Sequence, residues 1–218
     1  MANRYKAVIF DLDGTLMDTL DDLHLSTNYA LRQFGLPERS LDEVCSFVGN
    51  GVRKLIERAL PPDFPSHSVD EVLAVFRLHY AEHCRDHSAP YEGIGQMLAA
   101  MSQRGVKMAI VSNKPDKEVK RLKEEFFSSY LTVALGENEK AGIPKKPSPE
   151  MLCEAMRQLA CDASEVLYVG DSDVDIQTAT NAGVDCASVT WGFRSEAFLL
   201  EHGGHIIVHQ PDELLALV

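Results

Sequence analysis

The stretch VIFDLDGT at residues 8–15 provides the starting point for interpreting the whole chain. Its first half is an apolar run short enough for a buried strand, and two aspartates, a glycine and a threonine follow. In an open α/β sheet, ligands bind beyond the carboxyl ends of the parallel strands, where a carboxylate can serve as nucleophile, acid or metal ligand. The same residues could form an ordinary Asp-Gly turn. A calcium loop is excluded, because glycine stands fourth instead of sixth from Asp11, and Asp22 stands twelfth, where glutamate is needed.

Composition restricts the class of protein before any motif is considered. The chain has 218 residues, of which 45% are hydrophobic, which suits one globular unit or a domain with an insert. Its net charge of −12 argues against a general nucleic-acid surface or an anionic membrane as partner. The sequence contains no apolar run of membrane length and no signal peptide. Five scattered cysteines without CxxC spacing are typical of reduced thiols, so a cytoplasmic location is expected.

Helical periodicity follows the first strand without interruption by a second strand. Apolar residues at three- and four-residue steps predict a helix over residues 16–34. Ser40 and Ser68 each begin a capping-box pattern that predicts a further helix, and another short helix is expected between those two. The sequence therefore predicts an all-helical cap domain at residues 16–87.

The remainder of the chain alternates between strands and helices. Further strands are predicted at residues 106–111, 131–135, 166–169 and 186–189. Strands that alternate with helices require a parallel sheet covered on both faces. The predicted fold class is therefore α/β: a doubly wound, Rossmann-like parallel sheet made from residues 1–15 and 88–218, with the helical cap inserted after the first strand.

Polar residues follow three of the predicted strands, and a Lys-Pro turn precedes a helix. In order along the chain, these motifs are Asp11-Leu12-Asp13-Gly14-Thr15, Ser112-Asn113, Lys146 in Lys-Pro-Ser-Pro, and Gly170-Asp171-Ser172-Asp173-Val174-Asp175. Each motif is weak when taken singly. Their combination resembles the haloacid dehalogenase superfamily of phosphohydrolases, in the branch with a helical cap after the first strand, and the resemblance covers the whole chain.

The resemblance implies a phosphoryl-transfer site in which positioning and charge neutralisation do most of the work. Asp11 would be the nucleophile that forms an aspartyl-phosphate, and Asp13 would be the general acid and base. Mg²⁺ would be held by Asp11, by the main-chain carbonyl of Asp13 and by Asp171. The phosphoryl oxygens would be bound by Ser112, Asn113 and Lys146.

Several of these residues also have ordinary structural explanations. Ser112 and Asn113 could form a simple turn. Lys146 is preferred over Lys145 because it directly precedes Pro147, but either lysine could be solvated. An EF-hand reading of the second acidic motif fails, because neither its sixth nor its twelfth position carries the required residue. Supporting roles are expected for Thr15, Ser172 and Asp175, whereas a solvated position is expected for Asp173.

Two features of the predicted cap concern ligands. Residues 47–53, which include Asn50, Gly51 and Arg53, resemble the corresponding segment of phosphoglycolate phosphatases. They are expected to reach the leaving group of the substrate, and Arg53 could pair with a carboxylate, although a plain helix–helix turn with a surface arginine remains an alternative. Three histidines spaced by four residues end the last cap helix: His79, His83 and His87. A polar helix face is favoured there over a zinc site.

The sequence thus predicts a Mg²⁺-dependent phosphatase whose partner is a small phosphorylated metabolite, with 2-phosphoglycolate as the best single substrate. Other readings are a broader hydrolase of sugar phosphates, nucleotides or pyrophosphate, a phosphoglucomutase-like isomerase, a dehalogenase, and a non-catalytic binding protein. A dehalogenase is disfavoured because that branch lacks the second aspartate, which this chain keeps as Asp13. No nucleic acid or membrane partner is expected, and the chain is expected to be a monomer or homodimer.

Overall fold

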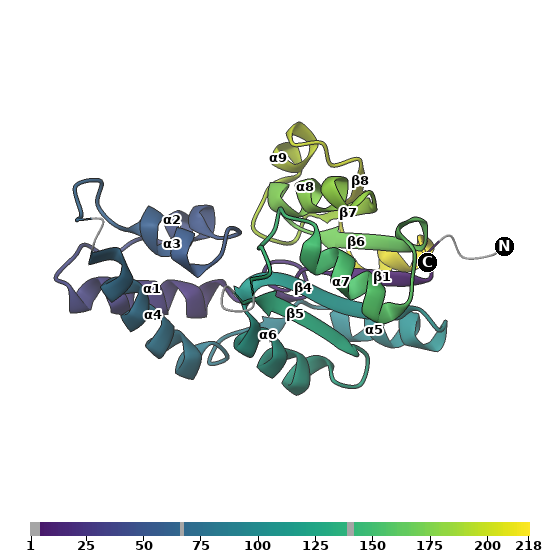
Figure 1. Cartoon of the computed structure of the whole chain (residues 1–218), viewed down its shortest axis with the longest axis horizontal. Helices are drawn as coiled ribbons and strands as arrows, with labels where there is room; N and C mark the ends of the chain where they lie inside the picture. Colours follow the sequence, from purple (N-terminus) through teal and green to yellow (C-terminus); the bar gives the residue numbers. More distant parts are fainter. Residues whose placement is uncertain (1–4, 66–67, 139–141) are drawn as a thin grey trace.

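The protein consists of an α/β sheet unit and a group of helices that extends from one end of it. The structure, a computed structural model, describes residues 5–65, 68–138 and 142–218. Figure 1 shows the sheet with helices on both faces, and the helices α1–α4 grouped together at the left of the molecule. The C-terminus lies at the opposite end of the sheet unit from this helical group.

The central sheet of the described residues has six strands, and β1 (Ala7–Phe10) lies inside it. Every neighbouring pair of these strands is parallel, in the order β5-β4-β1-β6-β7-β8. The strands that follow β1 are β4 (Lys107–Pro115), β5 (Val133–Glu137), β6 (Val166–Gly170), β7 (Asp185–Val189) and β8 (Ile206–Val208). The chain builds outward from β1 on one side, returns to β1, and then builds outward on the other side. This confirms the doubly wound parallel sheet.

The predicted strands are all present, but the sequence pattern missed one strand of the central sheet and misplaced the end of another. It also did not predict the short pair Met17–Asp18 and Ala89–Pro90. β8, at the edge of the sheet, was not predicted because its three residues are too short for a periodic pattern. β4 continues to Pro115 instead of ending at Val111, with a shift of register along the way. Ser112 and Asn113 therefore belong to an irregular strand end and not to the simple turn considered from the sequence.

The two faces of the sheet are covered by different helices because successive strand residues point to opposite sides. Val8 and Phe10 of β1 pack in the same apolar cluster as α5 (Ile94–Gln103) and α6 (Asp116–Leu122). Ala7 and Ile9 pack with α7 (Glu150–Leu159), α8 (Asp173–Ala182) and α9 (Glu196–Glu201). All four of these β1 residues are fully buried, so the strand that precedes Asp11 is fixed from both faces.

The described residues between 16 and 87 form four helices with an apolar cluster of their own. These helices are α1 (Leu20–Gln33), α2 (Leu41–Phe47), α3 (Val52–Ala59) and α4 (Val69–His83). The predicted capping box at Ser40 is confirmed, since its hydroxyl accepts a hydrogen bond from the Glu43 amide. The capping box predicted at Ser68 is wrong, because that side chain makes no capping hydrogen bond, although the helix does begin directly after it.

None of the helices in the described ranges is long and apolar enough to cross a membrane. The five cysteines are free thiols, as their scattered spacing predicted.

Two short antiparallel strands join the helical group to the sheet unit. β2 (Met17–Asp18) pairs with β3 (Ala89–Pro90), so the outgoing and returning connections lie side by side. This pairing explains why α1 begins at Leu20 and not at Leu16, where its apolar periodicity begins.

Asp22 fastens the returning connection to α1. Its buried carboxylate accepts hydrogen bonds from the backbone amides of His87 and Ser88, at 3.0 and 2.9 Å, and from the Ser88 hydroxyl at 2.6 Å. A buried carboxylate with several donors is costly to replace, because each donor would lose its partner without access to water.

We predict that Asp22→Asn lowers the free energy of unfolding by about 2–3 kcal/mol, since the amide nitrogen of asparagine cannot accept these hydrogen bonds. Urea unfolding followed by circular dichroism measures this loss. The neighbouring Asp21→Asn is the matched control, because Asp21 is exposed on the same turn. Equal stability of the two variants would contradict the assigned role of Asp22.

Candidate active site

Three strands place their polar carboxyl ends at one edge of the sheet. Phe10, the last residue of β1, is in register with Ile110 of β4 on one side and with Val169 of β6 on the other. The residues that follow each strand end are therefore level across the sheet. This alignment brings together Asp11, the Ser112 segment and Asp171, as expected for a ligand site at the switch in strand order.

Asp11 is a buried carboxylate with one oxygen already occupied. Its Oδ1 accepts a hydrogen bond from the Leu12 amide at 2.7 Å and lies 3.0 Å from the Lys146 ammonium. Burial raises the pKa of Asp11 to about 7; Lys146 opposes this rise, and the carboxylates of Asp175 and Asp13 add to it. Its Oδ2 has no protein partner among the described residues, which leaves that oxygen available to a ligand.

Lys146 lies at the centre of a buried set of acceptors. Its Nζ contacts Asp11, the Asp175 carboxylate at 2.7 Å and the Tyr168 hydroxyl at 3.0 Å. Burial would lower the pKa of Lys146, but the carboxylates of Asp11 and Asp175 raise it above its usual value, so the side chain remains an ammonium. Lys145 instead pairs with Glu137 at 3.1 Å. The geometry thus favours Lys146 as the lysine of this site.

Asp171 approaches the backbone that follows β1 so closely that only glycine fits there. A Cβ on Gly14, whose φ is +80°, would lie 2.3 Å from Asp171 Oδ2. A Cβ on Gly192 would lie 2.2 Å from the carbonyl oxygen of Gly14. Asp171 itself accepts a hydrogen bond from the Phe193 amide at 2.7 Å and a long one, of 3.4 Å, from the Thr15 hydroxyl. These glycines allow a carboxylate and two backbone turns to converge.

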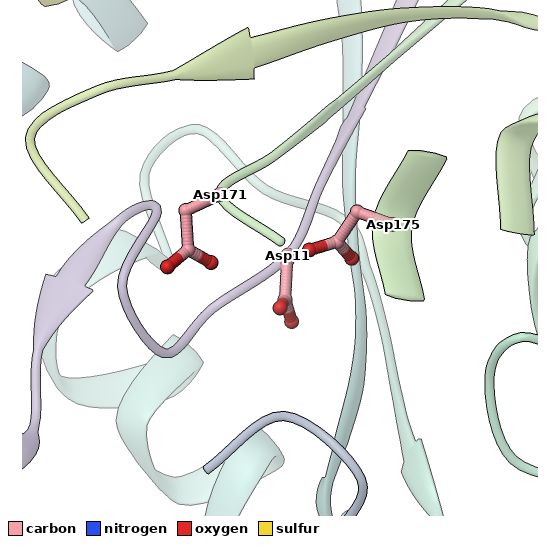
Figure 2. A group of neighbouring side chains, drawn as sticks. All are labelled: Asp11, Asp171 and Asp175. Atoms are coloured by element: carbon pink, nitrogen blue, oxygen red, sulfur yellow. The ribbon is translucent and has the colours of Figure 1, made fainter. Parts of the chain in front are cut away.

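The donor set at this point suits a hard divalent cation. Asp11, Asp171 and Asp175 each offer a carboxylate oxygen, and these oxygens lie within 4.8 Å of one another. Figure 2 shows the three side chains coming from the end of β1, from the turn after β6 and from α8. Lys146, Tyr168 and Ser172 already occupy both oxygens of Asp175.

Asp171 shows most clearly that a cation fits. It is buried, and it forms no ion pair within 4.0 Å in the part of the chain that the structure describes. Burial, together with the nearby carboxylates of Asp175 and Asp11, holds its pKa well above the usual range. Asp11 and Asp171 are therefore the carboxylates that could bind a metal ion such as Mg²⁺.

Asp13 stands two residues beyond Asp11 and has its own set of partners. Its Oδ1 accepts a hydrogen bond from the Thr19 hydroxyl at 2.8 Å and lies 2.8 Å from Lys114 Nζ. Lys114 also donates to the hydroxyl of Tyr80, on α4 of the helical group. Burial would lower the pKa of Lys114, but Asp13 and Tyr80 raise it above its usual value. Lys114 is therefore a buried ammonium that connects the sheet unit to the helical group.

Ser112 and Asn113 both line the cavity at this edge, but their side chains have different surroundings. The Ser112 hydroxyl accepts one hydrogen bond of 3.3 Å from the Lys114 amide. The Asn113 side chain donates to the carbonyls of Gly49 and Lys146, at 3.1 and 3.0 Å, and accepts from the Lys146 amide at 2.8 Å. Its side-chain amide thus holds both the turn that carries Lys146 and the loop at Gly49, so a phosphoryl contact from Asn113 would have to come from its backbone.

A small, partly open cavity lies between Asp11 and the helical group. The centre of a water molecule can occupy about 40 Å³ of it. Four apolar residues of the helical group line the cavity: Leu23, Val48, Val52 and Leu55. Gly51 of the predicted substrate loop lines the cavity as well, and a Cβ there would lie 3.3 Å from the Asn113 carbonyl.

Two residues of the predicted substrate loop lie away from this cavity. The Arg53 guanidinium donates to Asp70 at the start of α4, and its side chain is partly exposed. Asn50 lines a different, outer hollow together with Arg58 and Asp173. Arg53 is thus paired within the helical group and does not line the cavity, whereas its neighbour Val52 does.

Arg194, which the sequence did not single out, fastens the helical group over the cavity. Its guanidinium donates to the carbonyls of Cys45 and Val48, at 2.9 and 2.8 Å, at the C-terminal end of α2. The adjacent Phe193 holds Asp171 through its amide. The only sequence signal was that these residues follow a predicted strand end near Gly192, as the other site residues do.

The three histidines of α4 and its end do not converge on one point. His79 stacks between Tyr29 and His83. His83 pairs with Asp86 at 2.7 Å, and His87 pairs with Asp22 at 3.0 Å. Within the described ranges, the one group of three or more potential ligands that lie close enough to share a metal ion is the aspartate group at the sheet edge. The polar-face interpretation of the histidines thus agrees with the geometry.

The chain is similar in sequence and in structure to known proteins. Residues 8–189 match the family described as haloacid dehalogenase-like hydrolase. A phosphoglycolate phosphatase from Aquifex aeolicus is 35% identical over 189 residues, covering 86% of this chain and 86% of that protein. An N-acetylmuramic acid 6-phosphate phosphatase from Pseudomonas aeruginosa is 34% identical over 221 residues, covering 97% and 94%. A provisionally assigned phosphoglycolate phosphatase from Lactobacillus delbrueckii subsp. bulgaricus, a crystal structure, gives a TM-score of 0.92 at 36% identity, covering 99% of each chain.

We predict that Mg²⁺ raises the melting temperature, and more at about pH 8 than at about pH 5. The raised pKa of Asp11 means that ionising this carboxyl destabilises the metal-free folded state as the pH rises from its ordinary value of 3.8 towards 7. A divalent cation binds the ionised form, so its stabilisation is largest where that form dominates. Differential scanning fluorimetry with Mg²⁺ or EDTA measures the shift.

Asp171→Asn should abolish the Mg²⁺ shift because it removes one of the buried ligands. Asp173→Asn is the matched control, since Asp173 lies two residues away and outside the cavity. A shift of equal size at both pH values, or one that survives Asp171→Asn, would show that the cation binds elsewhere.

Proposed function

The chain belongs to the haloacid dehalogenase-like hydrolase family, and its relatives are phosphatases; we propose that it hydrolyses 2-phosphoglycolate to glycolate and phosphate, with Mg²⁺ as cofactor. The observation that supports this substrate best is the small cavity above Asp11, which suits a compact leaving group. The chemistry proceeds through an aspartyl-phosphate on Asp11.

The first step transfers the phosphoryl group to the protein. A carboxylate oxygen of Asp11 attacks phosphorus and forms an acyl-phosphate bond, while the bond between phosphorus and the leaving oxygen breaks. Asp13, two residues away, donates a proton to that oxygen and releases glycolate. Its Oδ1 is held by the Thr19 hydroxyl and Lys114, so the proton would be carried on Oδ2, which has no partner among the described residues.

The second step returns Asp11 to its starting form. Asp13, now ionised, takes a proton from a water molecule that attacks the phosphorus atom, and the bond between phosphorus and Asp11 breaks. Lys146 and Ser112 stabilise the charge on the phosphoryl oxygens in both steps. Lys146 is well suited to this role, because Asp175 and Tyr168 fix its ammonium next to Asp11.

Mg²⁺ would be held by Asp11, Asp171 and the main-chain carbonyl of Asp13. When bound, it offsets the repulsion between these carboxylates and a phosphate dianion. The chain carries a net charge of −12, so a local positive charge is needed for an anionic substrate to enter.

The helices α1–α4 act as the cap domain of the proposed enzyme, with residues 16–87 inserted into a core of residues 1–15 and 88–218. Closure over Asp11 excludes water until the acyl-phosphate has formed, and reopening releases glycolate. The paired connections β2 and β3 provide the site at which this motion can occur.

The identities of the relatives do not separate two substrates, because the phosphoglycolate and N-acetylmuramic acid 6-phosphate enzymes match this chain about equally. Both substrates are phosphorylated acids, which supports a substrate with a carboxylate. The small and largely apolar cavity favours the smaller of the two.

We predict that phosphate release in the presence of Mg²⁺ is fastest with 2-phosphoglycolate, by at least about 10-fold in kcat/KM over other substrates, a difference of about 1.4 kcal/mol in transition-state binding. The comparison panel contains N-acetylmuramic acid 6-phosphate, a hexose phosphate, a nucleoside monophosphate and pyrophosphate. EDTA should remove all of this activity.

Preference for the larger amino-sugar phosphate would contradict the size argument and favour the second relative's substrate. Broad activity without preference would leave the phosphatase chemistry in place and refute 2-phosphoglycolate as the specific substrate. Activity that persists in EDTA would contradict the role of the metal.

A further inference from the structure

We propose that Lys114 binds the carboxylate of the substrate, and that the site therefore selects phosphate esters of 2-hydroxy carboxylic acids. This inference rests on the proposed function and names the chemical feature that the enzyme recognises. It assigns to Lys114 the role that the sequence suggested for Arg53.

The first argument concerns the positive charges available at the cavity. Among the described residues that line it, the cations are Lys114 and Arg194. The Arg194 guanidinium donates to backbone carbonyls of the cap, which leaves it committed to holding α2. Lys146 lies next to Asp11 and is assigned to the phosphoryl group by the proposed function, so it does not serve a second anionic group. Lys114 is therefore the cation best placed to meet a second anionic group of the ligand.

The second argument concerns the hydrogen-bonding capacity of Lys114. An ammonium group has three N–H donors. Two partners are in contact with it, the Asp13 carboxylate at 2.8 Å and the Tyr80 hydroxyl. The side chain is only 1% exposed, so a third acceptor has to come from inside the cavity that Lys114 lines. A carboxylate bound inside the cavity would complete this set and form a charge-assisted hydrogen bond in a poorly solvated environment.

The third argument concerns the position of Lys114 relative to the reacting atoms. Asp13 must lie within about 3 Å of the leaving oxygen in order to protonate it. Lys114 lies 2.8 Å from Asp13, so its ammonium is next to the leaving group. In 2-phosphoglycolate a single methylene separates the leaving oxygen from the carboxylate carbon. Such a short acid can place its oxygen at Asp13 and its carboxylate at Lys114 together, whereas a longer acid displaces one of the two.

Tyr80 makes this recognition depend on cap closure. Its hydroxyl comes from α4, whereas Lys114 belongs to β4 of the core. The contact between them fixes the ammonium only when the cap is in place. The apolar cap residues above it, Val52 and Leu55 among them, would not compensate a substrate charge themselves.

The first experiment uses the wild-type enzyme and three phosphate esters of similar size. 2-Phosphoglycolate carries the carboxylate one methylene away, 3-phosphopropionate carries it two methylenes away, and 2-hydroxyethyl phosphate has a hydroxyl in its place. We expect kcat/KM to fall by about 10- to 100-fold from the first ester to each of the others. Equal values for 2-phosphoglycolate and 3-phosphopropionate would refute selection of 2-hydroxy acids.

The second experiment compares Lys114→Met and Lys114→Arg on 2-phosphoglycolate and 2-hydroxyethyl phosphate. Loss of the Asp13 partner lowers kcat for both substrates in the methionine variant, so the informative quantity is the ratio of the two kcat/KM values. We expect this ratio to fall to about one in Lys114→Met, and to recover in part in Lys114→Arg, which keeps the charge. Lys120→Met, an exposed lysine of α6, is the matched control and should keep the wild-type ratio.

These measurements separate the two proposals. If the wild-type enzyme shows no preference for 2-phosphoglycolate over 2-hydroxyethyl phosphate, the proposed substrate is wrong, and the role of Lys114 is refuted with it. If the wild-type preference is present and survives in Lys114→Met, the substrate stands and the role of Lys114 is refuted, which would leave Lys114 as a partner of Asp13 only. If Lys114→Met does not fold, the wild-type series with 3-phosphopropionate still decides whether the site recognises a 2-hydroxy acid.

Discussion

The site depends on the neutralisation of buried negative charge. Three aspartate carboxylates lie within 4.8 Å of one another at the edge of the sheet. Without compensation, their mutual repulsion and their burial would drive them to the protonated form, and neither a nucleophile nor a metal ligand would remain. The ammonium of Lys146 contacts both Asp11 and Asp175 and neutralises part of this negative charge. The charge of Asp171 stays uncompensated, because this carboxylate has no such partner among the described residues. It is the strongest reason to expect a cation at the site.

The same contacts that assemble the charges also hold the cap. The Asn113 side chain binds the Lys146 backbone and, through the Gly49 carbonyl, the loop between two cap helices. On the other side of the cavity, Phe193 holds Asp171 while the adjacent Arg194 binds the end of α2. Cap position and site geometry are therefore coupled through neighbouring residues on two loops of the core. This arrangement explains how a closed cap can complete the site without contributing any residue of the acidic cluster.

The sequence predicted the elements with strong local signals and missed those that depend on tertiary contacts. The order of strands and helices and the helical insert followed from periodicity, and the convergence of Asp11, Ser112 and Asp171 followed from polar strand ends. Lys146 was assigned through the resemblance of its Lys-Pro turn to the family motif. The three-residue strand β8 and the strand-like extension of β4 could not be predicted, since both are defined by their neighbours in the sheet. Lys114 and Arg194 were missed because their roles come from contacts across the chain, 101 residues apart for Lys114 and Asp13. Arg53 was offered as a carboxylate partner because its loop resembles that of phosphoglycolate phosphatases. Gly51 of that loop lines the cavity, whereas the Arg53 guanidinium donates to Asp70.

The central claim, that Asp11 receives the phosphoryl group, is tested most directly by acid quenching and mass spectrometry during turnover of 2-phosphoglycolate. Asp13→Asn removes the base of the second step and should allow the acyl-phosphate to accumulate. Because it also removes the acid of the first step, this variant is given p-nitrophenyl phosphate, whose leaving group needs no proton. The account predicts an increase equal to one phosphoryl group, located on the peptide that contains Asp11 and absent when Asp11 is replaced by asparagine. A phosphoryl group on another residue, or activity that persists in Asp11→Asn, would contradict it.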